Sequence, residues 1–473
     1  MKLVGLVVAI FGATYIAGTL AHPYIDGDLF WQRWLGEHIL RTGEIPRALG
    51  PETFAAVGAP WLPQEWLFST LYALAVAAHG AWFFHAAVGA CVAATLYMVA
   101  RRTTAHAGTL ASVAAVVLCG IALDPSLGVR AQDVGWLCFA ALLSILDWDD
   151  NRVFWAVPLV IVWANVHASA VVALPLVAID LLITPRRDPG VLKRRLLLMV
   201  ALLGAICVGP FGIALPMYAL HLSGSPIRTY IVEWQSWAWY RPSFVLVVFP
   251  VIATLAVRFR WALRQPREVL RVALFIAMSC MAIRNVALLG IAAAPLFATL
   301  LDPWLSRVTF PSIKLQEPAK RLLAIGVGAA LVLVFALSYR LAHVPNGGRL
   351  PFAAMRRIAR LPGERRLYCT DFAWCSMSLG DVRMRVYLDG RADPFPWPVW
   401  RRYLRIARGG SRAVTTLRRI RANTVIAGKN GALGTTLLRQ ANWRRVYVGS
   451  ISDVFVRIRS NVNVRSAATR KPT

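Results

Sequence analysis

Long apolar runs constrain the fold of this sequence more than any other feature. Leu3–Leu20 and Leu322–Leu337 carry no charged residue at all. Charge-free runs of about 18 residues are typical of membrane-spanning helices. Only 16% of the chain is charged and 58% is hydrophobic, which excludes a soluble globular enzyme. Because the runs do not alternate in polarity, a porin-type barrel is excluded too. The sequence predicts an α-helical polytopic membrane protein.

The transmembrane domain is predicted over 1–343, with about 11–13 transmembrane helices. Leu3–Leu20 is expected to remain as an anchor, because it is long for the core of a signal peptide. The segment 66–79 is the weakest candidate span because it is short. The full set of apolar segments is 3–20, 66–79, 81–100, 107–123, 133–146, 153–168, 169–184, 195–210, 243–257, 269–283, 286–301 and 321–341.

The orientation is predicted from Lys and Arg in short loops, which are retained in the cytoplasm. Pro185–Arg195 and Arg258–Arg271 are the most basic loops, so both are placed in the cytoplasm. The opposite side then receives the loops at 124–132 and 211–242 and the C-terminal domain. We expect a bacterial cytoplasmic (inner) membrane protein with an extracytoplasmic C-terminal domain.

The C-terminal region 344–473 differs sharply in composition from the rest, with 26 basic and 6 acidic residues. Short strand patterns alternate with helical ones, which predicts a small α/β domain. Its basic surface is expected to attract anionic lipids or an anionic polymer. No nucleic-acid partner is expected outside the cell. Cys369 and Cys375 could form a disulfide if the domain is extracytoplasmic.

The first polar loop, 21–65, contains the richest candidate chemistry. Asp26 and Asp28 follow the first span directly. Two carboxylates at this spacing could act as a base or hold a divalent cation such as Mg²⁺ or Mn²⁺. A solvated loop pair is the alternative. Residues 29–40 are predicted to form an amphipathic interfacial helix with its Trp side chains at headgroup level.

Several polar residues interrupt or end the apolar segments. A charge in mid-span costs about 2.5–3.5 kcal/mol on insertion scales, so such residues need partners. Arginines are natural phosphate ligands, which predicts a lipid-phosphate site, although helix packing is the alternative for each residue. The candidate binding residues are Arg130, Gln132, Asn165, His167, Glu233, Arg284 and Asn285.

The C-terminal segment Tyr387–Pro394 (YLDGRADP) carries a second cluster of charges. Asp389, Arg391 and Asp393 could bind a ligand. A turn after a strand, with a local Asp–Arg pair, explains the same pattern.

The segment DGDLFWQRWLGEHILRTGEIP, with the following GAPWLPQEWL, resembles the first extracytoplasmic loop of bacterial integral-membrane glycosyltransferases of the GT-C superfamily. The later pieces GVRAQ, WANVHA, GPFG, VEW, IRN and YLDGRAD resemble that group in the same order. The resemblance implies a transferase that takes a sugar from a polyprenyl-phosphate carrier at the outer leaflet and inverts the anomeric centre. It implies that Asp26 or Asp28 serves as the catalytic base or as a metal ligand.

The predicted function is therefore sugar transfer from a polyprenyl-phosphate-linked donor to an envelope acceptor. Two other functions remain open from sequence. A lipid or sugar transporter, or a flippase, would use the same polar groups to line a path, although no internal repeat is evident. A non-catalytic scaffold would use only the basic C-terminal domain to bind envelope polyanions.

Overall fold

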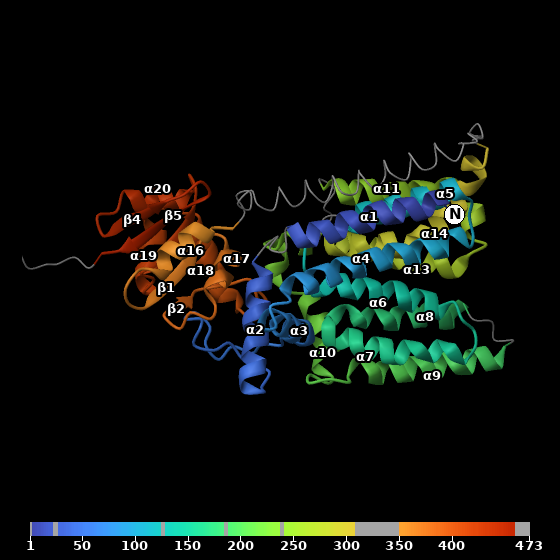
Figure 1. The fold of residues 1–473 in the computed structure, drawn as a ribbon, viewed down its shortest axis with the longest axis horizontal. Coiled ribbons are helices and arrows are strands. Elements are labelled where there is room, and N and C mark those ends of the chain that lie inside the picture. The colour runs from blue at the N-terminus through green and yellow to red at the C-terminus, as the bar shows by residue number, and fades with distance from the viewer. Residues whose placement is uncertain are drawn as a thin grey trace, which may run out of the picture. The chain divides into compact units, whose positions relative to one another are not determined.

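The computed structural model describes residues 2–21, 27–123, 128–183, 188–236, 241–307 and 350–458 (Figure 1). The chain divides into two compact units. The membrane unit comprises Met1–Ile25, Leu35–Ile45 and Leu62–Asn346. The sheet unit comprises Asp26–Trp34, Pro46–Trp61 and Gly347–Thr473, so it contains two pieces of the first loop as well as the C-terminal region. The apolar segment predicted at 321–341 lies outside the described residues.

The membrane unit is built from helices that follow the apolar segments. Within the described residues, three stretches are long and apolar enough to cross a membrane: Leu3–Ala21 of α1, Ala81–Thr104 (α4) and a stretch containing α14. That stretch is Ile283–Leu305. Of the residues in its most apolar part 78% are buried, whereas only 28% of those in α1 are, so α14 is the central helix. Helices α6–α9 lie alongside one another within this unit (Figure 1). The α-helices are α1 (Lys2–Ala21), α3 (Trp66–Ala77), α4 (Ala81–Thr104), α5 (Thr109–Leu123), α6 (Ala131–Leu146), α7 (Ala156–Val166), α8 (Ala173–Ile183), α9 (Pro189–Ile206), α10 (Ala214–Ser223), α11 (Pro242–Val257), α12 (Phe259–Ala262), α13 (Pro266–Met281) and α14 (Val286–Leu305).

Two short helices bear on the predicted spans. Helix α3 has 12 residues, and at 1.5 Å per residue it is about 18 Å long, which is too short to cross a bilayer core of about 30 Å. The sequence likewise makes 66–79 the weakest candidate span. Helix α10 lies in the segment 211–242, which was predicted as a loop. Its ten residues are too few to be recognised in the sequence as a membrane-spanning segment.

One end of the membrane unit is held by a buried network of ion pairs. Arg271, which is fully buried, donates to Asp180 at 3.0 Å and contacts Asp147 at 3.3 Å. Arg195 is 1% exposed and donates to Asp149 at 3.0 Å. These residues lie in or next to helices α6, α8, α9 and α13, so the network joins four helices. Charges buried in this way are tolerated because each has an opposite partner.

Helix α6 separates this network from a second polar cluster. Arg130 is the residue before α6 and Asp147 is the residue after it. Sixteen helical residues place the two about 24 Å apart. The polar residues of the membrane unit are thus concentrated at opposite ends of its helices. The two basic loops contribute Arg195 and Arg271 to the network beside Asp147.

The sheet unit confirms the predicted small α/β domain. Its five strands are β1 (Arg365–Cys369), β2 (Met384–Val386), β3 (Thr424–Gly428), β4 (Trp443–Val448) and β5 (Ser452–Arg457), in the order β2-β1-β3-β5-β4. Strand β1 pairs in parallel with β2 and β3, and β5 pairs antiparallel with β3 and β4. The helices are α16 (Phe352–Ala359), α17 (Phe372–Cys375), α18 (Trp397–Ala407), α19 (Ser411–Arg419) and α20 (Ala432–Leu438).

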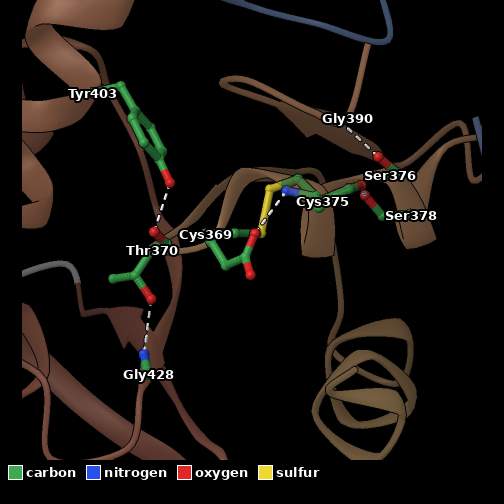
Figure 2. Close-up of a disulfide and its surroundings, with 10 residues drawn as sticks. Cys369, Thr370, Cys375, Ser376, Ser378, Gly390, Tyr403 and Gly428 are labelled. Atoms are coloured by element: carbon green, nitrogen blue, oxygen red, sulfur yellow. Dashed lines mark hydrogen bonds between the residues drawn. A yellow bond between two sulfur atoms is a disulfide. The ribbon is translucent and has the colours of Figure 1, made fainter. Parts of the chain in front are cut away.

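A disulfide joins the end of β1 to the end of α17. Cys369 and Cys375 are bonded, six residues apart (Figure 2). Beside them, Tyr403 donates to the carbonyl of Thr370, and Thr370 Oγ1 accepts from the amide of Gly428 at 2.8 Å. The cross-link therefore closes a short loop that is already fixed to β3 and α18.

Helix α2 (Asp28–Thr42) covers the segment for which an amphipathic helix is predicted. Its interfacial position stays a prediction. Trp31 and Leu35 are 8% and 0% exposed, and Trp31 meets Trp61 edge to face at 6.3 Å. The aromatic face is covered by protein, because the chain returns at Trp61 to pack on it.

Candidate active site

An arginine–glutamate pair marks the candidate site in the membrane unit. Arg130 lies in extended backbone just before α6, and Glu233 lies in a short 3-10 helix at Val232–Trp234. The Arg130 guanidinium donates to Glu233. Burial raises the pKa of Glu233, but the charge and hydrogen bond of Arg130 outweigh it, and the pKa is lowered overall. Glu233 is therefore ionised at neutral pH and balances the charge of Arg130.

Arg284 provides a second cation beside this pair. It lies in a 3-10 turn, Ile283–Asn285, between α13 and α14. Its Nη2 atom is 3.4 Å from Gln132 Oε1 and 3.3 Å from His167 Nε2. Among the described residues, no carboxylate lies within ion-pair distance of Arg284. Arg284 also helps to lower the pKa of Glu233, so it lies in the field of that carboxylate without a direct ion pair to it.

His167 is held through both ring nitrogens. Trp163 donates to Ser169 Oγ at 3.1 Å, and Ser169 Oγ lies 2.7 Å from His167 Nδ1. The backbone amide of Ser169 also donates to Nδ1, at 3.1 Å. Nε2 lies 3.3 Å from Arg284 Nη2, which can only donate, and 3.7 Å from Glu65 Oε1. The imidazole thus links Ser169 to the Arg284 and Glu65 side chains.

Asn165 and Asn285 hold the surrounding backbone. Asn165 accepts from Trp66 Nε1 at 3.1 Å and donates to the carbonyl of Val208 at 2.8 Å. A Cβ at Gly209 would lie 2.4 Å from Asn165 Oδ1, so only glycine fits there. Asn285 donates to the carbonyl of Met278 at 2.8 Å. For both residues a direct role in binding stays a prediction.

The structure therefore brings five of the predicted residues into one cluster in the membrane unit. They are Arg130, Gln132, His167, Glu233 and Arg284. Glu65 also belongs here but was not among the predicted site residues. The signal for it was its place just before a short apolar segment, inside the PQEW piece. Gln64 beside it accepts from the amide of Ala168 at 2.6 Å.

The first-loop carboxylates belong to the sheet unit. Asp26 lies outside the described residues. Asp28 is the first residue of α2 and its Oδ1 accepts from Trp31 Nε1 at 3.1 Å. A helix N-terminus stabilises a carboxylate, because the unpaired amides of the first turn carry partial positive charge.

The described residues do not supply a donor set for a divalent cation. None of them forms a group of three or more His, Cys, Asp or Glu side chains suited to a metal ion. Asp28 alone offers one carboxylate, whose Oδ1 accepts from an indole N–H.

Comparison with solved structures relates the fold to known enzymes. The sequence matches no protein-family model and no curated protein sequence. The fold is similar to ArnT from Cupriavidus metallidurans bound to undecaprenyl phosphate, with a TM-score of 0.52 and 12% identity, over 97% of this chain and 98% of that one.

Two structures of an archaeal enzyme are similar as well. One is the oligosaccharyltransferase AglB from Archaeoglobus fulgidus with an inhibitory peptide and a dolichol-phosphate, with a TM-score of 0.51 and 11% identity. It covers 89% of this chain and 69% of that one. An oligosaccharyltransferase of the same organism with zinc and sulfate has a TM-score of 0.52 and 12% identity, over 96% and 74%. At this identity the likeness establishes the fold, and the chain has the fold of the GT-C glycosyltransferases.

Proposed function

We propose that this chain is a membrane glycosyltransferase that moves a sugar from a polyprenyl-phosphate-linked donor to an envelope acceptor, with inversion. The observation that carries the proposal is Arg284, a cation without a carboxylate partner among the described residues, beside a second arginine and a neutral imidazole. A phosphate ester is the ligand that such a cluster suits. The fold shared with a protein bound to undecaprenyl phosphate supports the same class of donor.

The reaction follows from the chemistry of the residues. The acceptor hydroxyl attacks the anomeric carbon, and the bond from that carbon to the phosphate oxygen breaks. The electron pair leaves with the polyprenyl phosphate, and the hydroxyl proton passes to a carboxylate. We assign the base to Asp28 or Asp26. Arg284, with Arg130, balances the charge that develops on the leaving phosphate.

Transfer of label tests the function directly. The purified full chain in lipid nanodiscs is incubated with radiolabelled polyprenyl-phosphate sugars and extracted envelope acceptors. The proposal expects label to move from the lipid to an acceptor. Movement of the labelled lipid across a vesicle membrane, without any transfer product, would instead identify a flippase.

We also propose that the sheet unit lies on the extracytoplasmic side. Its disulfide supports this, because disulfides persist in oxidising compartments and are rare in the cytoplasm. A periplasm-active phosphatase fused after Thr473 is expected to be active in cells, and a cytoplasm-active fluorescent reporter fused there to be dark. The reverse pattern would overturn the assignment.

The basic surface of the sheet unit supports an anionic partner. No acidic residue occurs between Asp393 and Asp453. Eight exposed arginines lie on or beside α18 and α19, where the apolar faces of both helices are buried. They are Arg401, Arg402, Arg405, Arg408, Arg412, Arg418, Arg419 and Arg421. We propose that they hold this surface against anionic lipid headgroups.

Hydrogen exchange of the full chain tests this surface. In nanodiscs with 30 mol% anionic lipid, chosen as roughly a natural content, slower exchange of 397–421 is expected than in neutral nanodiscs. The protection should disappear in high salt, since exposed charges are screened. Equal exchange in both lipids would refute the proposal.

A further inference from the structure

The first loop completes the sheet of the sheet unit. Strand β2 lies at the edge of the sheet, and Thr53 pairs with its Val386 as an isolated parallel bridge. The amide of Val386 donates to the carbonyl of Glu52 at 2.8 Å, and the amide of Phe54 donates to the carbonyl of Val386 at 3.0 Å. An edge strand presents unpaired backbone groups, and here the first loop pairs with them.

Arg391 joins the loop after β2 to the first loop. Its guanidinium donates to Asp389 through Nε at 2.9 Å and through Nη2 at 2.7 Å, and to Glu52 through Nη1 at 2.7 Å. The two carboxylates keep the pKa of Arg391 raised despite burial, which alone would lower it. The local Asp–Arg pair suggested by the sequence is therefore present, and it extends to a carboxylate 339 residues away.

Two indole rings enclose the same guanidinium. Arg391 Cζ lies 5.1 Å from the centroid of Trp34 and 4.9 Å from that of Trp61. The rings of Trp34 and Trp61 stack with their centroids 6.2 Å apart. A buried cation beside aromatic rings gains energy from their negative faces. Trp34 lies on α2, the helix that Asp28 begins.

Gly390 brings the same loop against Asp28 itself. A Cβ at Gly390 would lie 3.0 Å from Asp28 Oδ1, 3.1 Å from Trp31 Cδ1 and 2.8 Å from Ser376 Oγ. The amide of Gly390 donates to Ser376 Oγ at 2.8 Å (Figure 2). Ser376 follows the disulfide-bonded Cys375, so the loop at Gly390 is itself anchored.

The disulfide loop approaches the other side of this segment. A Cβ at Gly27 would lie only 2.1 Å from the carbonyl oxygen of Ala373. Ala373 belongs to α17, inside the loop that Cys369 and Cys375 close. At Gly27 the backbone of Ala373 leaves no room for a side chain, and at Gly390 neighbouring side chains, that of Asp28 among them, fill the space. Asp28 directly follows Gly27, so both contacts bear on it.

We infer that the loop Asp389–Arg391 positions Asp28 for catalysis, so that the C-terminal region is part of the catalytic apparatus. The inference rests on the proposed function, in which Asp28 is a candidate base. Arg391 is a positioning residue: it contacts Trp34, on the helix that Asp28 begins, and Glu52, further along the first loop. Gly390 keeps the space that the carboxylate occupies.

Gly390→Ala is the sharpest test, because the added methyl group would meet Asp28 Oδ1 at 3.0 Å and Trp31 Cδ1 at 3.1 Å, besides Ser376 Oγ at 2.8 Å. A displacement of about 1 Å at a reacting group can cost about 100-fold in rate. We expect kcat for sugar transfer to fall about 10- to 100-fold, with KM for the lipid donor changed less than about twofold. Gly434→Ala is the matched control, since a Cβ there makes only ordinary contacts at 3.5 Å or more.

Arg391→Lys and Arg391→Met form the second arm. Arg391→Lys keeps the positive charge and should retain part of the activity. Arg391→Met leaves the carboxylates of Asp389 and Glu52 without this cation. Hydrogen exchange of Asp28–Trp34 is expected to become faster in Arg391→Met, and to a smaller extent in Arg391→Lys, while β3 and β5 stay protected in both variants. This readout needs no activity, so it tests the positioning contact even if the chain transfers no sugar.

The outcomes separate the two proposals. The positioning role alone is overturned by one pattern of results. Asp28→Asn is then inactive, whereas Gly390→Ala and Arg391→Met keep full activity and unchanged hydrogen exchange. Faster exchange at Asp28–Trp34 in a chain that transfers no label to any acceptor overturns the proposed function and leaves the contact standing. A higher KM for the lipid donor with an unchanged kcat would show an effect on binding and would refute positioning of a catalytic group.

Discussion

Asp28→Asn is expected to reduce sugar transfer by about 100- to 10,000-fold, which is the usual contribution of a general base. Asn has the same size and keeps an oxygen that can accept from Trp31 Nε1, the contact that holds Asp28 at 3.1 Å. The substitution therefore removes the charge and the proton acceptor and leaves the packing. Initial rates with saturating lipid donor measure the effect on kcat.

Two further variants make this result interpretable. Asp381→Asn removes a half-buried carboxylate of the same unit, one that pairs with Arg383 at 3.2 Å, and should leave the rate unchanged. Asp26→Asn tests the neighbouring carboxylate. If Asp28→Asn transfers sugar at the rate of the unchanged chain while Asp26→Asn does not, the base is Asp26. Full activity in both variants would remove the first-loop carboxylates from the mechanism.

The sheet unit was largely predictable because its signals are local. Short runs of β-branched and other apolar residues indicate β3 and β5, and the helical patterns expected between strands are observed as α18, α19 and α20. The participation of the first loop was not predictable. Glu52 and Arg391 are 339 residues apart, and nothing local in PETF indicates that this segment pairs with a sheet edge.

The helices of the membrane unit were predictable from the same kind of signal, whereas their partners were not. Hydropathy shows where Arg130 and Arg284 lie relative to the apolar segments. It does not show that Arg130 pairs with Glu233 while Arg284 contacts Gln132 and His167. The two arginines look alike in sequence. Only the contacts show that Arg130 forms an ion pair and that Arg284 forms none with the described residues.

That distinction predicts a larger effect at Arg284 than at Arg130. Arg284→Ala is expected to lower kcat/KM about 100- to 1,000-fold, because removing one group that stabilises developing negative charge costs about 2.7–4 kcal/mol. Arg284→Lys should keep part of the activity, since it retains the charge but not the planar pair of donors. The measurement is kcat and KM for the lipid-linked sugar at constant ionic strength.

The control is an arginine of the same unit with no part in the cluster. Arg264 is exposed and contacts the ring of Trp261, so Arg264→Ala should change neither constant. Arg130→Ala has a second effect, because it leaves the carboxylate of Glu233 without its cation and places a negative charge where the phosphate is expected. The double variant Arg130→Ala/Glu233→Gln removes that repulsion and should recover part of the lost affinity for the donor. If Arg284→Ala transfers sugar normally, the leaving phosphate is stabilised elsewhere, and the unneutralised cation serves only the packing of α13 and α14.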